Sequence, residues 1–201
     1  TFSTTDEVIA IMAGGEGAFV RAVEGAEDSQ ELAVEDLRGI GLKKEDVVLA
    51  IAASGRTPYC IGALKEARKK KARCMSLACN HDALISKYAD VAIEVDAGPE
   101  VLTGSTRLKA GTCQKLILNM ISTTAMVGIG KVYNNYMVDM KATNYKLADR
   151  AKRIVMECTQ CSEKQAEKVL KGADGSIKTA VVMLLTGVTR TEAEEKLKIS
   201  G

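Results

Sequence analysis

The sequence predicts a three-layer α/β fold, a parallel sheet flanked by helices, followed by a small C-terminal module of three helices. Short apolar runs alternate with longer segments of helical periodicity over roughly the first 130 residues. Within the expected strand at 46–53, residues 47–53 are apolar without alternation, which is typical of a strand buried on both faces of a parallel sheet. From Ser162 onward the apolar spacing is helical, and glycines divide the segment into three short pieces.

The elements divide the chain into three expected regions. Strands are expected at residues 8–13, 46–53, 73–78 and 90–95, and helices at 18–23, 30–38, 59–71, 105–129 and 143–157. The last three helices are expected at 162–170, 176–185 and 189–198, with capping boxes starting at Ser162 and Thr191. We therefore expect an α/β domain over residues 1–130, a connecting helical segment over 131–160, and the three-helix module over 161–201. The module has the layout of ubiquitin-associated bundles, and we interpret it as a dimerisation element or a lid.

Composition excludes several classes of function. The net charge of +2 and the scarcity of aromatic residues argue against nucleic-acid binding, and no apolar run reaches membrane-spanning length. A cytoplasmic location is the default expectation, with the six cysteines reduced. Cys158 and Cys161 form one C-x-x-C pair, but with a single histidine in the chain a metal site is poorly supported. We expect no metal and no cofactor.

The turn after the strand at residues 46–53 is predicted to bind an anion. Ser54, Gly55, Arg56 and Thr57 precede Pro58, which suits the first turn of a helix. Free backbone N–H groups, two hydroxyls and a guanidinium at a helix N-terminus favour a phosphate. The alternative is that Ser54 and Thr57 only cap the helix.

Two other segments carry charge in informative places. Glu27 lies where one helix ends and the next begins, which locally suggests no more than a negatively charged helix start. Arg107 and Lys109 are expected in the first two turns of the helix at 105–129, where positive charge opposes the helix dipole. An anionic ligand there would remove this penalty. The alternative is that both side chains extend into solvent or pair with Glu100.

Several motifs together resemble one family. These are VEGAED at 23–28, IAASGRTPY at 51–59, GPEVLTGSTRLKAGT at 98–112, QKLILNM at 114–120, GKVY at 130–133 and MVDMKATN at 137–144. They look like N-acetylmuramic acid 6-phosphate etherase, an enzyme of the sugar isomerase (SIS) fold that acts in peptidoglycan recycling. The long motif at 98–112 is shared with the glucokinase regulatory protein, a non-catalytic relative.

The resemblance implies a reaction and roles for residues. The family cleaves the lactyl ether of N-acetylmuramic acid 6-phosphate by elimination and hydration, giving N-acetylglucosamine 6-phosphate and D-lactate. This chemistry needs a general base and a general acid near C2 and C3 of the sugar. One family glutamate falls on Glu27, with removal of the C2 proton as its implied role, and partial burial is expected to move its pKa toward neutrality. The substrate-binding residues implied are Ser54, Gly55, Arg56, Thr57, Glu100, Ser105, Arg107 and Lys109.

The chain also departs from the family pattern. The family's other catalytic glutamate and its first strand lie upstream of the segment that matches Thr1. We therefore expect half of the catalytic pair here, and either a truncated chain or a second polypeptide that supplies the strand, because a sheet without it would leave strand edges unpaired. A homodimer is expected by analogy. The alternatives are a sugar-phosphate-binding regulator of the same fold and a structural dimerisation protein with a degenerate pocket.

Overall fold

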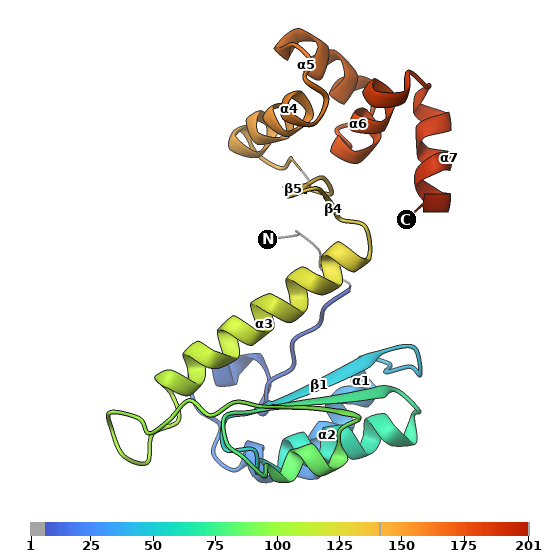
Figure 1. The fold of residues 1–201 in the computed structure, drawn as a ribbon. Helices are drawn as coiled ribbons and strands as arrows, with labels where there is room; N and C mark the ends of the chain where they lie inside the picture. The colour runs from blue at the N-terminus through green and yellow to red at the C-terminus, as the bar shows by residue number, and fades with distance from the viewer. Residues whose placement is uncertain (1–6, 141, 201) are drawn as a thin grey trace. The chain divides into compact units, whose positions relative to one another are not determined.

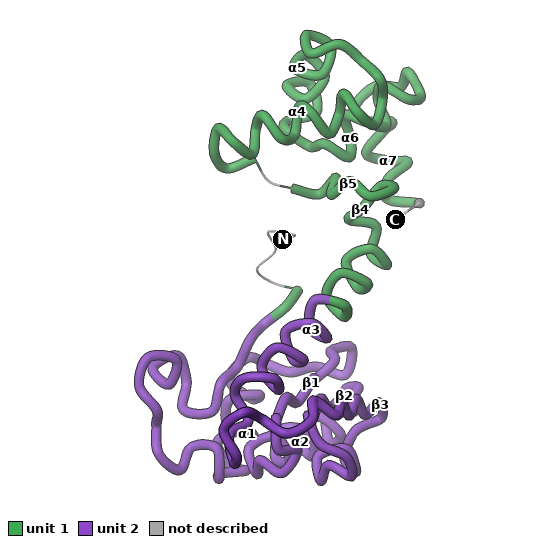
Figure 2. The backbone as a smooth tube through the Cα atoms, turned by 60° about the vertical axis from the view of Figure 1, so that its left-hand side comes forward, with its two compact units in different colours: residues 1–8, 120–201 green, residues 9–119 purple. Residues whose placement is uncertain are grey.

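The computed structural model describes residues 7–140 and 142–200, and in these the chain forms two compact units. What is here called the first unit comprises Ile9–Asn119, drawn in purple and labelled unit 2 in Figure 2. The second unit, green and labelled unit 1 in the figure, comprises the described residues from Met120 onward together with Glu7 and Val8. The boundary falls inside one long helix, α3 (Lys109–Gly128). Each unit is described by itself. Predictions about Lys141 and about any segment before Thr1 lie outside the described residues.

The first unit contains a three-stranded parallel sheet in the order β1-β2-β3. Its strands are β1 (Val47–Ala52), β2 (Arg73–Ala78) and β3 (Val91–Glu94), and its helices besides α3 are η1 (Glu16–Phe19), η2 (Ala26–Asp28), α1 (Gln30–Gly39), α2 (Pro58–Lys69) and η3 (Leu84–Tyr88). Val47 pairs with Arg73 and Met75 with Val91, so all three strands run in the same direction. The predicted class, a parallel α/β sheet flanked by helices, is confirmed.

The core of this unit lies between the sheet and the helices α1 and α2 (Figure 1). Ala50, Ala52 and Cys74 point into it from the strands, and Leu64 of α2 is fully buried there. On the opposite face of β1, Val47 is 58% and Ile51 is 38% exposed. The expectation that β1 is buried on both faces is therefore wrong, since only one of its faces meets the core.

The first expected strand is absent. Residues 8–13 form irregular backbone, and Val8, Ile9 and Met12 are all more than 40% exposed. A strand exists only where another strand accepts and donates its hydrogen bonds. No segment among the described residues pairs with residues 8–13 or with the outer edge of β1. The expected helix at 18–23 is also wrong, because only the single turn η1 forms, slightly earlier in the chain.

The second unit is a helical bundle preceded by a short hairpin. Its elements after α3 are β4 (Val132–Tyr133), β5 (Tyr136–Met137), α4 (Tyr145–Thr159), α5 (Glu163–Gly172), α6 (Ile177–Thr186) and α7 (Arg190–Ser200). The antiparallel pair β4–β5 was not predicted; Asn134 makes its turn with φ of 54°. Val155, Ala166 and Ile177 join α4, α5 and α6 in one core, so α4 belongs to the bundle.

The helix starts of the bundle follow the predicted signals in part. Ser162 accepts from the backbone N–H of Gln165, whose side chain reaches back to Ser162, so the predicted capping box is confirmed. The last helix, α7, begins at Arg190, one residue after the expected start, but its capping box is not the predicted one. Glu192 accepts from the Thr189 N–H at 2.8 Å, which places the capping box at Thr189 and not at Thr191.

Candidate functional site

The carboxyl ends of β1 and β2 are joined by backbone hydrogen bonds. Cys79, directly after β2, donates to the carbonyl of Ala53, and Ile85 donates to the carbonyl of Gly55, each at 3.0 Å. A Cβ at position 55 would lie 2.4 Å from the Cβ of Ala83, and Gly55 has φ of 68°. Glycine is therefore required at this turn, which holds residues 54–57 at the end of the sheet.

Residues 54–57 present polar groups at the start of α2. The hydroxyl of Ser54 accepts from the backbone N–H of Arg56 at 3.3 Å, within the loop. Thr57 is the N-cap residue, yet its side chain makes no capping hydrogen bond, and no acidic residue occupies the first turn of α2. Pro58 takes the first helical position, as predicted. The interpretation of Ser54 and Thr57 as mere caps is wrong, because neither side chain bonds to the helix.

Glu27 lies beside the start of α2. A Cβ on Gly62 of α2 would lie 2.4 Å from the carbonyl oxygen of Gln30, so only glycine allows α1 to begin this close to α2. The Ser29 side chain caps α1 by accepting from Leu32 at 3.2 Å. Burial raises the pKa of the Cys60 thiol to about 11, and the nearby charge of Glu27 contributes to the rise. The helix packing thus brings Glu27 to the end of α2 that carries Thr57.

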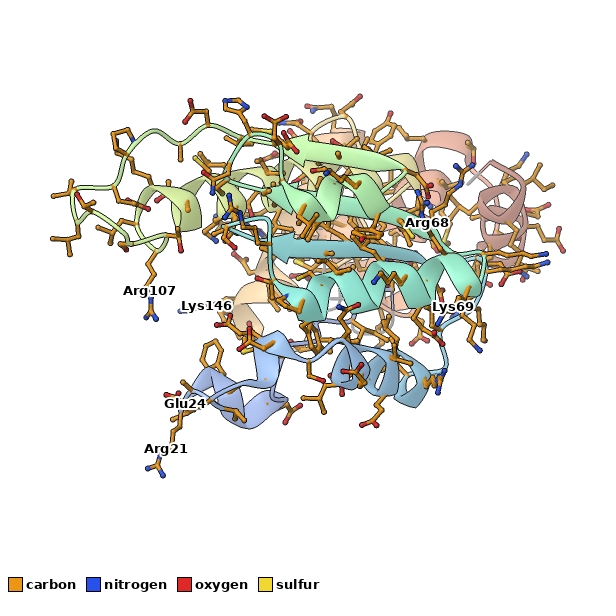
Figure 3. The ribbon with its side chains drawn as sticks, turned by 90° about the horizontal axis from the view of Figure 1, so that it is seen from below. Arg21, Glu24, Arg68, Lys69, Arg107 and Lys146 are labelled. Carbon is orange, nitrogen blue, oxygen red and sulfur yellow. The ribbon has the colours of Figure 1, made fainter. Side chains whose placement is uncertain are left out.

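The Glu27 side chain is exposed. The expectation that the Glu27 carboxyl group is partly buried is therefore wrong for this chain by itself. The 3-10 turn η2 that carries it buries only Ala26, which faces the protein interior. Nearby, Arg21 and Glu24 point away from the body of the unit (Figure 3).

Glu100 holds the start of α3. Its carboxylate accepts hydrogen bonds from the backbone N–H groups of Leu108 at 3.1 Å, Lys109 at 2.9 Å and Ala110 at 3.2 Å. The hydrogen bond from Lys109, with those from Ala110 and Leu108, lowers the pKa of Glu100. The anion expected at this helix start is thus a side chain of the chain itself.

The other residues expected around α3 do not all converge on one point. The helix begins at Lys109 and not near Ser105, so Arg107 precedes it. Ser105 accepts from the backbone N–H of Arg107 at 3.3 Å, and the Arg107 side chain extends outward into solvent (Figure 3). The Lys109 ammonium lies 3.9 Å from the position that a Cβ on Gly98 would take. The structure thus groups Glu27 with residues 54–57, and Glu100 with Lys109, at the carboxyl edge of the sheet.

Comparison with known proteins identifies the family. The family model of the SIS domain matches residues 31–127, and that of the C-terminal lid domain of glucokinase regulatory protein matches residues 134–173. A protein of Mycolicibacterium smegmatis named N-acetylmuramic acid 6-phosphate etherase is 56% identical over 202 aligned residues, covering 100% of this chain and 68% of its own length. The chain belongs to the N-acetylmuramic acid 6-phosphate etherase family. Proteins of the same name from a Geobacillus species and from Shouchella clausii are also 56% identical over 199 residues. This chain spans 68% of the length of the first protein and 67% of the length of the second.

One residue that supports the candidate site, Glu94, is not predicted by the sequence. In this etherase-family chain, Glu94 ends β3 and accepts from Asp82 at 2.9 Å, Ala83 at 3.0 Å and the hydroxyl of Ser86 at 2.6 Å. The hydrogen bond from Ser86, with those from the two backbone groups, lowers the pKa of Glu94. Because Ala83 packs on Gly55, Glu94 positions the loop that supports residues 54–57. The sequence signal that could have identified Glu94 is an acidic residue at the end of an otherwise apolar strand.

The described residues contain no candidate metal centre. No three His, Cys, Asp or Glu side chains within them gather in a way that could hold a metal ion. In that part of the chain there is also no helix long and apolar enough to cross a membrane.

Proposed function

We propose that this chain cleaves the lactyl ether of N-acetylmuramic acid 6-phosphate, giving N-acetylglucosamine 6-phosphate and D-lactate during the recycling of cell-wall amino sugars. The observation that carries the proposal is the 56% identity to an etherase along the whole of this chain. The arrangement of the carboxyl edge of the sheet supports it, since it combines a candidate phosphate loop with a carboxylate.

The phosphate of the substrate is proposed to bind at residues 54–57. The first turn of α2 has no acidic residue and no capping side chain, so its N–H groups remain available to an anion. Ser54 and Thr57 supply hydroxyls, Gly55 provides the close turn, and Arg56 supplies a positive charge.

Glu27 is proposed as the general base. In the open-chain aldehyde, the proton at C2 lies next to the C1 carbonyl, so a carboxylate can remove it. The lactyl oxygen then leaves C3 with its bonding electrons and takes a proton, and a C2–C3 double bond forms. Water then adds to this bond at C3, which restores the sugar. Glu27 fits the first step, because its exposed carboxylate stands beside the proposed phosphate loop.

The second carboxyl group of the mechanism is proposed to come from outside these 201 residues, as the family resemblance implies. The outer edge of β1 supports this proposal, since no described segment pairs with it. A further strand, from a longer chain or from a second polypeptide, would fit at this edge. We propose a homodimer as the assembly, by analogy with proteins of this fold. We propose the cytoplasm as the location, because a phosphorylated sugar does not cross a bilayer unaided.

Glu100, Ser105, Arg107 and Lys109 are proposed to line the other side of the site. Glu100 would do so indirectly, because its carboxylate is engaged in holding α3. Ser105 shapes the turn that carries Arg107. Arg107 and Lys109 then offer positive charge to the anionic substrate.

The direct test follows the substrate by NMR. The chain, and a version extended upstream as in the longer relatives, are incubated with N-acetylmuramic acid 6-phosphate, and free D-lactate is measured. Release of D-lactate by the extended chain supports the etherase. Tight binding of the substrate by both chains, without release of D-lactate and without exchange of the C2 proton, would instead indicate a sugar-phosphate-binding regulator.

A further inference from the structure

We propose that Cys79 and Cys113 form a thiol pair that closes to a reversible disulfide under oxidising conditions and fastens the start of α3 to the end of β2. The observation behind this proposal is that the Cys79 thiol contacts the first turn of α3 at the carbonyl oxygen of Ala110, 3.6 Å away. The inference does not depend on the proposed function.

The backbone places the two cysteines on facing elements. Cys79 follows β2 directly and is fixed by its hydrogen bond to the carbonyl of Ala53. Ala110 and Cys113 are three residues apart in α3, and residues at this spacing lie on the same face of a helix. The carbonyl that Cys79 contacts therefore borders the side chain of Cys113. Burial raises the pKa of Cys79, and the Cys113 thiol contributes to this rise. Such a contribution requires the two thiols to lie near each other.

The pair differs from the other cysteines of the same unit. Cys60 and Cys74 are buried, and their thiols lie 3.5 Å from the carbonyls of Ile51 and Leu64. Cys79 and Cys113 are only partly buried, so an oxidant can reach them. The raised pKa of Cys79 keeps it a thiol at neutral pH. We therefore expect slow closure that needs an added oxidant.

The reaction balances with glutathione disulfide as the oxidant. One protein thiolate attacks a sulfur of glutathione disulfide, and one glutathione thiolate leaves. The second protein thiolate then attacks the protein sulfur of this mixed disulfide, and a second glutathione thiolate leaves. Two protein thiols are oxidised, two glutathione thiols are formed, and the two protons move to them. Dithiothreitol reverses the change.

The disulfide would restrain the segment between the two cysteines. This segment contains β3, and it contains Glu100, whose carboxylate organises the start of α3. A covalent bond across the segment reduces the conformational freedom of the unfolded chain. We therefore expect oxidation to raise the midpoint of thermal unfolding of the first unit by roughly 5–10 °C.

The experiment uses the whole chain with Cys158→Ser and Cys161→Ser, which removes the C-x-x-C pair. The protein is treated with excess glutathione disulfide, free thiols are blocked, and unreduced peptides are analysed by mass spectrometry. We expect a peptide pair joined through Cys79 and Cys113 and no retained glutathione. In the further variant Cys79→Ser, glutathione should stay attached to Cys113, because the resolving thiol is gone.

Other outcomes would overturn the proposal. Stable glutathione adducts on both Cys79 and Cys113 would show that the two thiols cannot meet. Bonds from either cysteine mainly to Cys60 or Cys74 would show that oxidation follows unfolding. Complete lack of reaction under native conditions, with normal reaction in denaturant, would show that the pair is closed to oxidants.

Discussion

The backbone N–H of Lys109 donates a 2.9 Å hydrogen bond to the carboxylate of Glu100, nine residues earlier in the chain. The same carboxylate accepts from Leu108 and Ala110, so one side chain satisfies three donors around the start of α3. The sequence suggested that the positive charges of Arg107 and Lys109 at this helix start serve an anionic ligand. In the structure, the Glu100 carboxylate supplies a negative charge there. The Arg107 side chain points into solvent (Figure 3).

Loss of the Glu100 charge should destabilise the first unit in a pH-dependent way. Hydrogen bonds from backbone groups lower the pKa of Glu100 from its ordinary 4.5 in the folded chain. A lowered folded pKa gives stability that is present above 4.5 and is lost as pH falls through the folded value. Glu100→Gln should therefore lower the thermal midpoint at neutral pH, and the difference from the parent should shrink in acid.

Thermal melts between pH 3 and 7 measure this difference. Glu35→Gln is the matched control, because Glu35 is an exposed residue on α1 and the change should leave the melting curve in place. A difference for Glu100→Gln that does not vary with pH would contradict the assigned role of the charge.

Thr57→Ala separates ligand binding from helix capping. The Thr57 side chain makes no capping hydrogen bond, so its removal should change the free energy of unfolding by less than about 0.5 kcal/mol. Affinity for the sugar phosphate should nevertheless fall several-fold. Ser162→Ala removes a capping box and should cost about 1 kcal/mol. Urea unfolding and calorimetric titration give both quantities, and equal destabilisation by the two variants would restore the capping interpretation.

Gly62→Ala should disturb the packing that brings Glu27 to α2. The added Cβ would lie 2.4 Å from the carbonyl oxygen of Gln30, and we expect a loss of about 1–3 kcal/mol. Gly111→Ala in α3 meets no atom within 4 Å and should be stabilising by about 0.5–1 kcal/mol, since alanine favours a helix. Both values follow from urea unfolding. Similar effects of the two substitutions would rule out the close contact at Gly62.

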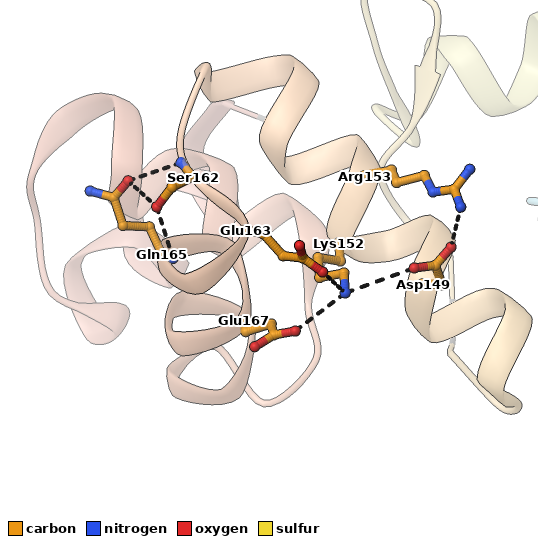
Figure 4. Close-up of polar contacts among 7 residues, drawn as sticks. All are labelled: Asp149, Lys152, Arg153, Ser162, Glu163, Gln165 and Glu167. Atoms are coloured by element: carbon orange, nitrogen blue, oxygen red, sulfur yellow. Dashed lines mark hydrogen bonds and ion pairs between the residues drawn. The ribbon is translucent and has the colours of Figure 1, made fainter.

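Lys152 is predicted to stabilise the second unit by joining α4 to α5 (Figure 4). Its ammonium lies 2.5 Å from Glu163 and 3.2 Å from Glu167, and hydrogen bonds to these two residues raise its pKa. Lys152→Met should lower the thermal midpoint, and the loss should be smaller at high salt, where charges are screened. Lys164→Met, an exposed position on α5, is the control. A loss that is independent of salt would point to packing and not to charge.

The parts of the fold that could be predicted are those determined by local pattern. The apolar run of β1, the strand Arg73–Ala78 and the capping box at Ser162 all occur where the residues indicate. The prediction failed where the outcome depended on distant partners. Residues 8–13 have the composition of a strand, but no segment in the described part of the chain pairs with them. The start of α3 moved to Lys109, where Glu100 holds it from outside the helix.

The candidate site was predictable in its residue types and less so in its geometry. Local sequence indicated a polar turn before Pro58, and the structure places Thr57 there with its side chain free of capping. Local sequence gave no reason to single out Glu27; the family resemblance did. Its position beside α2 depends on the contact between Gly62 and Gln30, which are far apart in sequence. Glu94 was overlooked because its role depends on the loop after a neighbouring strand.

Glu27 is proposed to remove the C2 proton of the sugar. The direct test of this role is exchange of that proton in deuterated water, followed by NMR, with N-acetylmuramic acid 6-phosphate as substrate. Glu27→Gln is compared with Glu24→Gln, which alters a neighbouring exposed glutamate (Figure 3). We predict that exchange persists in the Glu24 variant and falls at least about a hundredfold in the Glu27 variant, with substrate affinity retained. Undiminished exchange in Glu27→Gln would contradict the account.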